Sequence, residues 1–256
     1  MEPRSVLKIY GERNTGTNYL HQLVESNLDV ELLPGVVPLS VLRLRRFLPN
    51  TEFFNEMVRD LYFIVSYRKN LGWKHSLVKP VEQLSKYKIT QKNLSFVTIT
   101  KNPYSWLLSL YKRPYHQHWS VKPDFDSFLL LPWSTVKREN SPRKIKNPIE
   151  MWNLKNRAYL QLKRKFPTID LKYECLLLKP EQEVIRIKEK FSLVQKAWPF
   201  QNIEKSTKGD QKDFLYYQRY YIEERWRADL SPKSIYTINE YLDFSLMEHY
   251  GYTKLT

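Results

Sequence analysis

The chain has 256 residues, of which 42 are Lys or Arg and 27 are Asp or Glu, so its net charge is +15. With 42% hydrophobic residues and no internal repeat, it is neither a disordered tail nor a fibrous protein, and we expect one domain over residues 1–256. The single Cys175 excludes an internal disulfide and a cysteine zinc site.

Charge and hydropathy narrow the expected partners and compartment. The excess of cations predicts a surface that attracts phosphate, sulfate or nucleic acid, without choosing among them. The sequence has no apolar run of about 18 residues and no signal-peptide pattern at its start. We therefore expect a cytoplasmic protein with no membrane partner, and the oligomeric state is left open.

Strand and helix patterns alternate along the chain. Runs rich in β-branched and aromatic residues predict strands at residues 5–10, 61–67, 94–100 and 168–176. Apolar residues at helical spacing, with Pro and Gly as start and stop signals, predict helices over 19–26, from Pro103, over 149–166 and 180–191, and from 231 to just before Gly251. This alternation predicts an α/β fold in which helices cover both faces of a parallel β-sheet.

The segment after the first predicted strand, GERNTG, has the composition of an anion site. Gly11 and Gly16 permit a sharp turn, and the N–H groups at the start of the next helix favour a phosphate or sulfate. The glycines match the nucleotide P-loop, G-x-x-x-x-G-K-[ST], but Thr17 replaces its lysine, which argues against an ATPase or kinase. Thr and Asn are also common helix caps, so capping alone is an alternative interpretation.

A second strand end carries a pair of polar residues. Lys101 follows the strand predicted at 94–100, and Ser109 lies eight residues later, about two turns into the helix that begins at Pro103. Ligands of open α/β sheets bind outside the carboxyl ends of the strands. We therefore expect the GERNTG loop and Lys101 with Ser109 to open onto one crevice.

Five segments resemble, in the same order, sulfotransferases that use 3′-phosphoadenosine 5′-phosphosulfate (PAPS): RNTGTNYL, KNPYSWLLS, YECLLLKP, STKGDQKDF and INEYLDFSLMEHYGY. The resemblance runs from Lys8 to Tyr252 and implies the P-loop-like architecture of that family. It implies transfer of a sulfuryl group from PAPS to a hydroxyl or amine acceptor. An anionic carbohydrate is one candidate acceptor. The resemblance also implies a nucleotide site made of Arg13, Asn14, Thr15, Gly16, Thr17 and Asn18 at the 5′-phosphosulfate, Lys101 and Ser109 at the 3′-phosphate, and a closing loop with Lys208 and Gly209.

Cytosolic members of this family have a histidine as general base at a strand end, and His75 in LGWKHSL resembles it. An acceptor loses a proton as it attacks sulfur, and an imidazole is suited to take that proton. Lys74 would stabilise charge on the departing phosphate. Where the family has Lys or Arg in the loop, this chain has Asn14, so Arg13 or Lys74 supplies the charge. A lone histidine is more often a packing or surface residue, and only the neighbouring loops favour catalysis here.

Other polar groups have two interpretations each. His116 and His118 have a spacing seen in metal sites, but no third ligand accompanies them, and we expect no metal. Ten Lys or Arg between residues 137 and 165 form either a solvated face or a surface for an acidic acceptor. The tyrosines of 216–221 either stack on a sugar or base or pack against the core.

Two other functions stay open on the sequence alone. The charge and aromatic content suit a nucleic-acid-binding module, but no reading motif is present and we expect no nucleic-acid partner. The other function is a P-loop kinase acting on ATP, against which Thr17 argues. No motif identifies the acceptor, which we expect to contact the segments 33–55 and 114–141.

Overall fold

The computed structural model describes residues 5–44, 49, 51–205 and 211–256. At its centre a parallel sheet has the order β3-β1-β4-β7 and consists of β1 (Val6–Gly11), β3 (Glu31–Leu32), β4 (Leu94–Thr100) and β7 (Thr168–Lys172). Two antiparallel pairs lie outside it, β2 (Leu28–Asp29) with β8 (Val194–Gln195) and β5 (Trp133–Ser134) with β6 (Lys144–Ile145). The predicted α/β class with a parallel sheet is confirmed.

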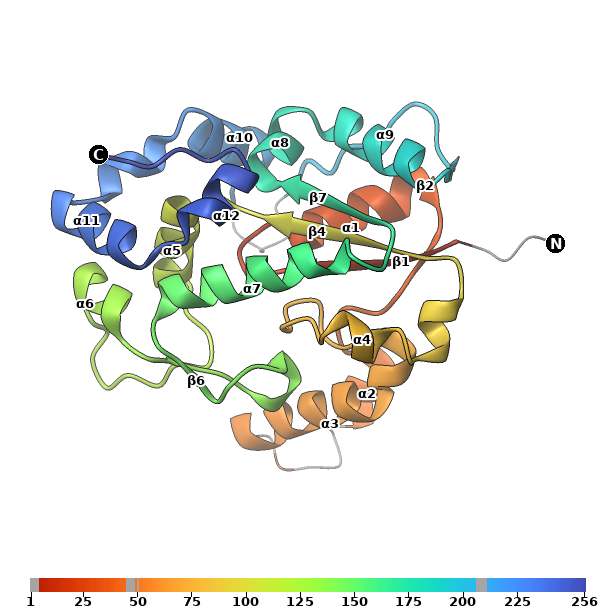
Figure 1. Cartoon of the computed structure of the whole chain (residues 1–256), viewed down its shortest axis with the longest axis horizontal. Coiled ribbons are helices and arrows are strands. Elements are labelled where there is room, and N and C mark those ends of the chain that lie inside the picture. Colours follow the sequence, from red (N-terminus) through yellow and green to blue (C-terminus); the bar gives the residue numbers. More distant parts are fainter. Residues whose placement is uncertain (1–4, 45–48, 50, 206–210) are drawn as a thin grey trace.

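Alternate residues of β1 face two helical layers, one on each side of the sheet (Figure 1). Leu7 and Ile9 share a hydrophobic cluster with α1 (Thr17–Asn27), α8 (Tyr173–Leu178) and α9 (Pro180–Lys190). Val6 and Tyr10 point the other way, toward α3 (Glu52–Asn70), α4 (Val81–Leu84) and α7 (Pro148–Leu162). The strand side chains alternate as the two-residue period of a strand requires, and both faces are buried.

Other helices complete the described chain. They are α2 (Leu39–Leu44), α5 (Pro103–Lys112), α6 (Phe125–Leu130), α10 (Phe214–Ile222), α11 (Pro232–Tyr241) and α12 (Phe244–His249), with 3₁₀ turns at Lys88–Gln91, Lys137–Glu139 and Arg225–Asp229. Within the described ranges, none of the helices is both long and apolar enough to cross a membrane.

The strand predicted at 61–67 is wrong, because these residues lie inside α3. Phe63 and Tyr67, four residues apart, are the buried side chains of this run, which is the spacing of one helix face. Thr51 accepts a hydrogen bond from the N–H of Phe54 (3.4 Å) and caps the start of the helix.

Two predicted boundaries are also wrong. The strand predicted at 168–176 ends at Lys172, which pairs with Thr100, the last residue of the neighbouring strand, and α8 follows at once. The predicted C-terminal helix is divided into α11 and α12. The side chain of Asp243 accepts from the N–H of Ser245 (3.1 Å) and so caps α12 as a separate helix.

The carboxyl ends of the strands meet at one edge of the sheet. Gly11 pairs with Ile99, and the chain leaves both strands within two residues of this pair. As predicted, α5 begins at Pro103, and the side chain of Asn102 accepts from the N–H of Tyr104 (3.1 Å). The segments that follow β1 and β4 therefore emerge side by side.

Candidate functional site

The loop between β1 and α1 is a tight turn that requires a glycine. Asn14 and Gly16 both have positive φ angles, of 67° and 84°. A Cβ atom on Gly16 would clash with the edge of the Tyr173 ring, so no other residue fits this position without rearrangement. The N–H and hydroxyl of Thr15 both donate to the carbonyl of Glu12, at 3.3 and 2.6 Å. The loop is thus fixed by hydrogen bonds between its own residues.

The first turn of α1 presents backbone donors that have no partner. Its N-cap, Gly16, offers no side-chain acceptor, and the first hydrogen bond of the helix runs from the N–H of Leu20 to the carbonyl of Gly16 (3.0 Å). Among the residues that the structure describes, the N–H groups of Gly16, Thr17 and Asn18 have no acceptor. Since no side chain caps the helix, the interpretation of this segment as a simple cap is wrong, and the helix dipole adds positive potential for an anion.

A second segment, Leu71 to His75, is held against the end of β1 by side-chain and backbone groups of that strand. Lys8 Nζ donates to the carbonyl of Gly72 (2.6 Å), and the N–H of Gly11 donates to the carbonyl of Lys74 (3.0 Å). This segment follows α3, so Lys74 and His75 lie in a loop, and the expectation that they end a strand is wrong. The strand nevertheless places them beside the anion-binding turn.

His75 has the tautomer and charge state of a base. Its Nδ1 lies 2.6 Å from the carbonyl oxygen of Gly11, which can only accept, so Nδ1 carries the proton and Nε2 keeps its lone pair. Burial, and next the positive charge of Lys74, hold the pKa of His75 well below its usual value. The imidazole is therefore neutral at pH 7.

Two cations, Lys74 and Arg13, lie beside the turn. Lys74 Nζ donates to the side chain of Asn18, and burial, followed by the charge of Arg13, lowers the pKa of Lys74 to about 8. The Arg13 guanidinium lies 4.4 Å from the ring centre of Tyr115 and 5.4 Å from that of Trp73. The structure thus brings both candidates for the missing loop lysine to the same place.

These groups line one hollow of the surface, which we call the loop hollow. Its lining includes Arg13, Asn14, Thr17, Lys74, His75 and Arg113. The side-chain Nδ2 atom of Asn14 is buried there without a hydrogen-bond partner in the described chain. The loop hollow therefore combines unpaired N–H donors, three cations and a neutral imidazole.

Lys101 and Ser109 lie together at the end of β4. Lys101 Nζ donates to Ser109 Oγ (2.8 Å) and lies 3.7 Å from the ring centre of Tyr221. Burial lowers the pKa of Lys101 well below its usual value, against the opposing effect of Glu174. Lys101 is fully buried, so that Ser109, and not Lys101, lines the surface.

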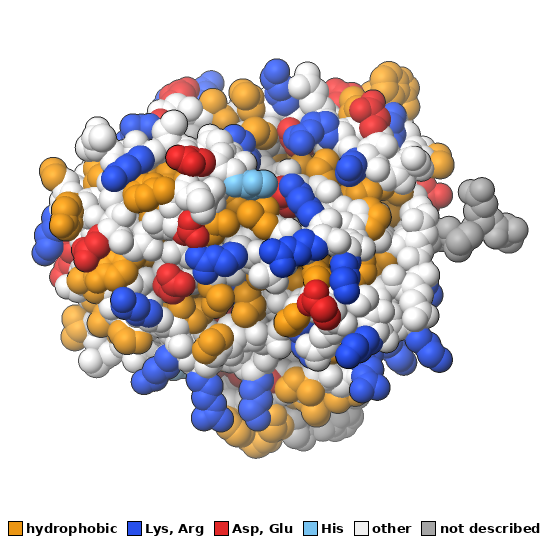
Figure 2. Space-filling model, viewed as in Figure 1, with side chains coloured by type: hydrophobic (Ala, Val, Ile, Leu, Met, Phe, Trp, Pro, Cys, Tyr) orange, Lys and Arg blue, Asp and Glu red, His pale blue; other side chains and the backbone are white. Residues whose placement is uncertain are grey.

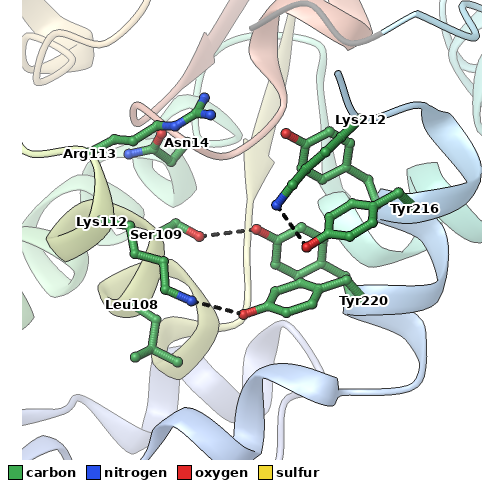
Figure 3. A pocket seen from close by; sticks show the side chains of 10 residues that line it. Asn14, Leu108, Ser109, Lys112, Arg113, Lys212, Tyr216 and Tyr220 are labelled. Carbon is green, nitrogen blue, oxygen red and sulfur yellow. Dashed lines mark hydrogen bonds between the residues drawn. The ribbon is translucent and has the colours of Figure 1, made fainter. Parts of the chain in front are cut away.

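A second hollow, the tyrosine hollow, lies between α5 and α10 and is lined by Ser109, Lys112, Lys212, Tyr216, Tyr220 and Tyr221 (Figure 3). Lys212 Nζ donates to Tyr216 Oη (2.8 Å) and Lys112 Nζ to Tyr220 Oη (3.3 Å). Asn14 and Arg113 line both hollows. The ends of β1 and β4 thus open onto two adjoining hollows. The loop hollow is basic, and the tyrosine hollow is both basic and aromatic.

A buried charge cluster beneath the loop was missed in the sequence. Lys155 Nζ of α7 lies 3.0 Å from Glu12 Oε2 and donates to the carbonyl of His75 (2.5 Å). Glu12 Oε1 accepts from the N–H of Arg13 (2.6 Å) and from the hydroxyl of Tyr115 (2.7 Å). Lys155 therefore ties the anion-binding turn and the His75 loop to one helix.

The basic stretch 137–165 is, as a whole, neither a solvated face nor a surface for an acidic acceptor. Lys155 is fully buried, and Arg138, also buried, pairs with Glu56 (2.6 Å) and Asp60 (2.8 Å) of α3. These two cations hold elements together and are not part of a solvated or ligand-binding face.

Some expected site groups have other surroundings. Lys208 and Gly209 lie outside the described residues. His116 Nε2 lies 3.1 Å from an Arg138 nitrogen, and burial, followed by Arg138, lowers the pKa of His116 to about 4. Within the described chain, no group of three or more His, Cys, Asp or Glu side chains is arranged to hold a metal ion. Arg113 was also missed, although its place four residues after Ser109 puts it near the same helix face.

Comparisons with known proteins give similarity of fold. No protein-family model matches the chain, and no curated protein matches it in sequence. The sulfotransferase domain from the Synechococcus PCC 7002 olefin synthase is similar, with a TM-score of 0.46 and 13% identity over 93% of this chain and 94% of that chain. The sulfotransferase domain from the curacin biosynthetic pathway is similar, with a TM-score of 0.49 and 12% identity over 100% of both chains. Similarities of this size assign no activity to the chain.

Proposed function

We propose that the chain is a PAPS-dependent sulfotransferase in which His75 is the general base. One observation carries the proposal: His75, whose neutral imidazole is anchored through Nδ1 to the carbonyl of Gly11, lines the same hollow as the uncapped start of α1. A base next to an anion-binding helix start is the arrangement that proton removal beside a sulfate group needs.

The residues present fit a nucleotide that is anionic at both ends. Unpaired N–H groups of the turn, the buried Nδ2 of Asn14 and the cations Arg13 and Lys74 suit the 5′-phosphosulfate. Ser109, supported by its hydrogen bond from Lys101, suits the 3′-phosphate in the adjoining tyrosine hollow. The exposed Tyr216 and the half-buried Tyr220 of that hollow offer rings on which adenine can stack. Thr15, Gly16, Thr17 and Asn18 complete the 5′ end, and Lys208 and Gly209 stay part of the proposal as the closing loop.

The chain's own residues would handle the proton and the charge. PAPS supplies the sulfuryl group, and the acceptor forms its new bond to sulfur as the sulfur–oxygen bond to the 5′-phosphate breaks. His75 Nε2 takes the proton that the hydroxyl or amine acceptor loses. Lys74 and Arg13 stabilise the negative charge that builds on the departing phosphate. These two cations supply the positive charge, so the proposal includes no metal.

The test compares His75→Ala with His249→Ala, a matched control on α12, far along the chain from the turn and exposed. Binding of adenosine 3′,5′-bisphosphate, followed by thermal shift, should be nearly unchanged in both variants. Transfer of radiolabelled sulfate from PAPS to a panel of acceptors, anionic carbohydrates included, should fall about 10²-fold or more in His75→Ala alone. Unchanged turnover in His75→Ala would remove the base from the proposal.

The thermal-shift screen also tests the competing functions. ATP with Mg²⁺ and single-stranded DNA are added beside adenosine 3′,5′-bisphosphate. Stabilisation by ATP alone would favour a kinase, and salt-sensitive stabilisation by DNA alone would favour a nucleic-acid-binding module.

A further inference from the structure

The helix α3 presents apolar side chains to solvent from Phe53 to Val65. The exposed residues are Phe53, Met57, Leu61, Ile64 and Val65, with exposed fractions of 71% for Phe53 and 75% for Val65. Their spacing of three to four residues places them in one stripe on one face, which we call the α3 stripe. In Figure 2, apolar side chains gather at the lower edge of the molecule, where Figure 1 places α3.

The rest of the molecule fixes this face outward. On other sides of α3, Phe63 and Tyr67 are buried, and Asp60 accepts from the Arg138 guanidinium (2.8 Å). Turning the α3 stripe toward the core would expose two aromatic rings and break a buried ion pair. The exposure of the stripe is therefore a consequence of the fold.

A basic hollow lies at the C-terminal end of the stripe. It is lined by Arg68 and Lys69 of α3 and by Lys86 and Lys88 of the segment after α4, with Tyr87 between them. None of these four cations forms an ion pair with any described residue. The α3 stripe thus runs into a cluster of unneutralised positive charge.

We propose that the α3 stripe and the basic hollow dock onto the surface of an anionic lipid bilayer. A helix with an exposed apolar face beside Lys and Arg lies in the headgroup region, where its apolar side chains leave water and its cations meet lipid phosphates. This mode requires no spanning segment. The proposal departs from the expectation of no membrane partner, which rested on the lack of a long apolar run and of a signal-peptide pattern in the sequence. A second copy of the chain suits the surface less well, because its own net charge of +15 repels the basic hollow.

The experiment is vesicle flotation with the full chain and does not depend on sulfotransferase activity. Vesicles of phosphatidylcholine are compared with vesicles that also contain phosphatidylserine. We expect binding to the anionic vesicles only, weakened by salt. Lys86→Gln with Lys88→Gln should lower the partition coefficient about 25-fold, at about five-fold for each cation removed. Leu61→Gln with Val65→Gln should lower it by at least about tenfold.

Matched controls are Val121→Gln, at an apolar side chain that is 81% exposed, and Lys144→Gln on β6. Both should bind vesicles like the unchanged chain, and all variants change exposed positions, so thermal unfolding should be similar throughout. Equal binding to neutral and anionic vesicles, or equal loss in the controls, would overturn the proposal. A second result would also overturn it: no binding to vesicles, together with a concentration-dependent dimer that Leu61→Gln abolishes. A second copy of the chain would then be the occupant of the α3 stripe.

Discussion

The pKa of Lys74 is lowered to about 8. If the chain binds the proposed nucleotide, its affinity should therefore depend on pH, and one substitution should remove that dependence. Lys74 is charged below this pKa and neutral above it. About nine in ten molecules carry the charge at pH 7, and about one in ten at pH 9. If the charge binds the 5′-phosphate, the association constant for adenosine 3′,5′-bisphosphate should fall about tenfold for each pH unit above 8.

The assay is isothermal titration with the bisphosphate between pH 7 and pH 10, which requires no acceptor. Lys74→Arg keeps its charge throughout this range, so its affinity should be flat. Lys74→Gln should bind the bisphosphate weakly at pH 7, and its affinity should also stay constant as the pH rises. If the unchanged chain binds equally at pH 7 and pH 10, or if Lys74→Arg shows the same fall, Lys74 is not the group that responds, and its role at the phosphate is wrong.

Two predictions concern the scaffold beneath the site, both measured by urea unfolding. Gly16→Ala adds a Cβ against the Tyr173 ring at a positive φ and should cost at least about 2 kcal/mol. Gly251→Ala, with a φ of 65° but only an ordinary contact to Lys172 Nζ (3.5 Å), should cost about 1 kcal/mol; equal costs would contradict the ring contact. Lys155→Met leaves Glu12 buried without its partner and should cost about 3 to 5 kcal/mol, most of which the added change Glu12→Gln should restore; no recovery would contradict the pairing.

Elements with complete local signals were predictable from the sequence. The strand at Leu94–Thr100 has a buried, β-branched pattern, and α5 has Asn102 as cap and Pro103 at its first position. The turn around Gly16 was likewise predictable, because glycine adopts the positive φ that a sharp turn between a strand and a helix requires. In each case the residues that decide the structure are neighbours in the chain.

The parts of the site that were missed depend on residues far apart in the sequence. Lys155 meets Glu12 only because the fold places α7 next to the loop. Nothing in the sequence of the basic stretch 137–165 distinguishes its one fully buried lysine from the other cations. Lys101 next to Ser109 followed from their spacing of eight, but the ring of Tyr221 over Lys101 did not. Spacing predicts which residues are near one another, and only tertiary packing decides which of them reach the surface.

The wrong strand at 61–67 has a physical cause that bears on the α3 stripe. A continuous apolar run predicts a buried strand on the assumption that every apolar residue is buried. Here Leu61, Ile64 and Val65 are exposed, and Phe63 and Tyr67 alone would have shown the four-residue spacing of a helix. These exposed apolar residues are not needed for the stability of the fold. Their presence concealed the helical spacing of the buried residues. In the proposed docking these same residues contact the bilayer. The strand prediction thus failed at the residues on which that docking depends.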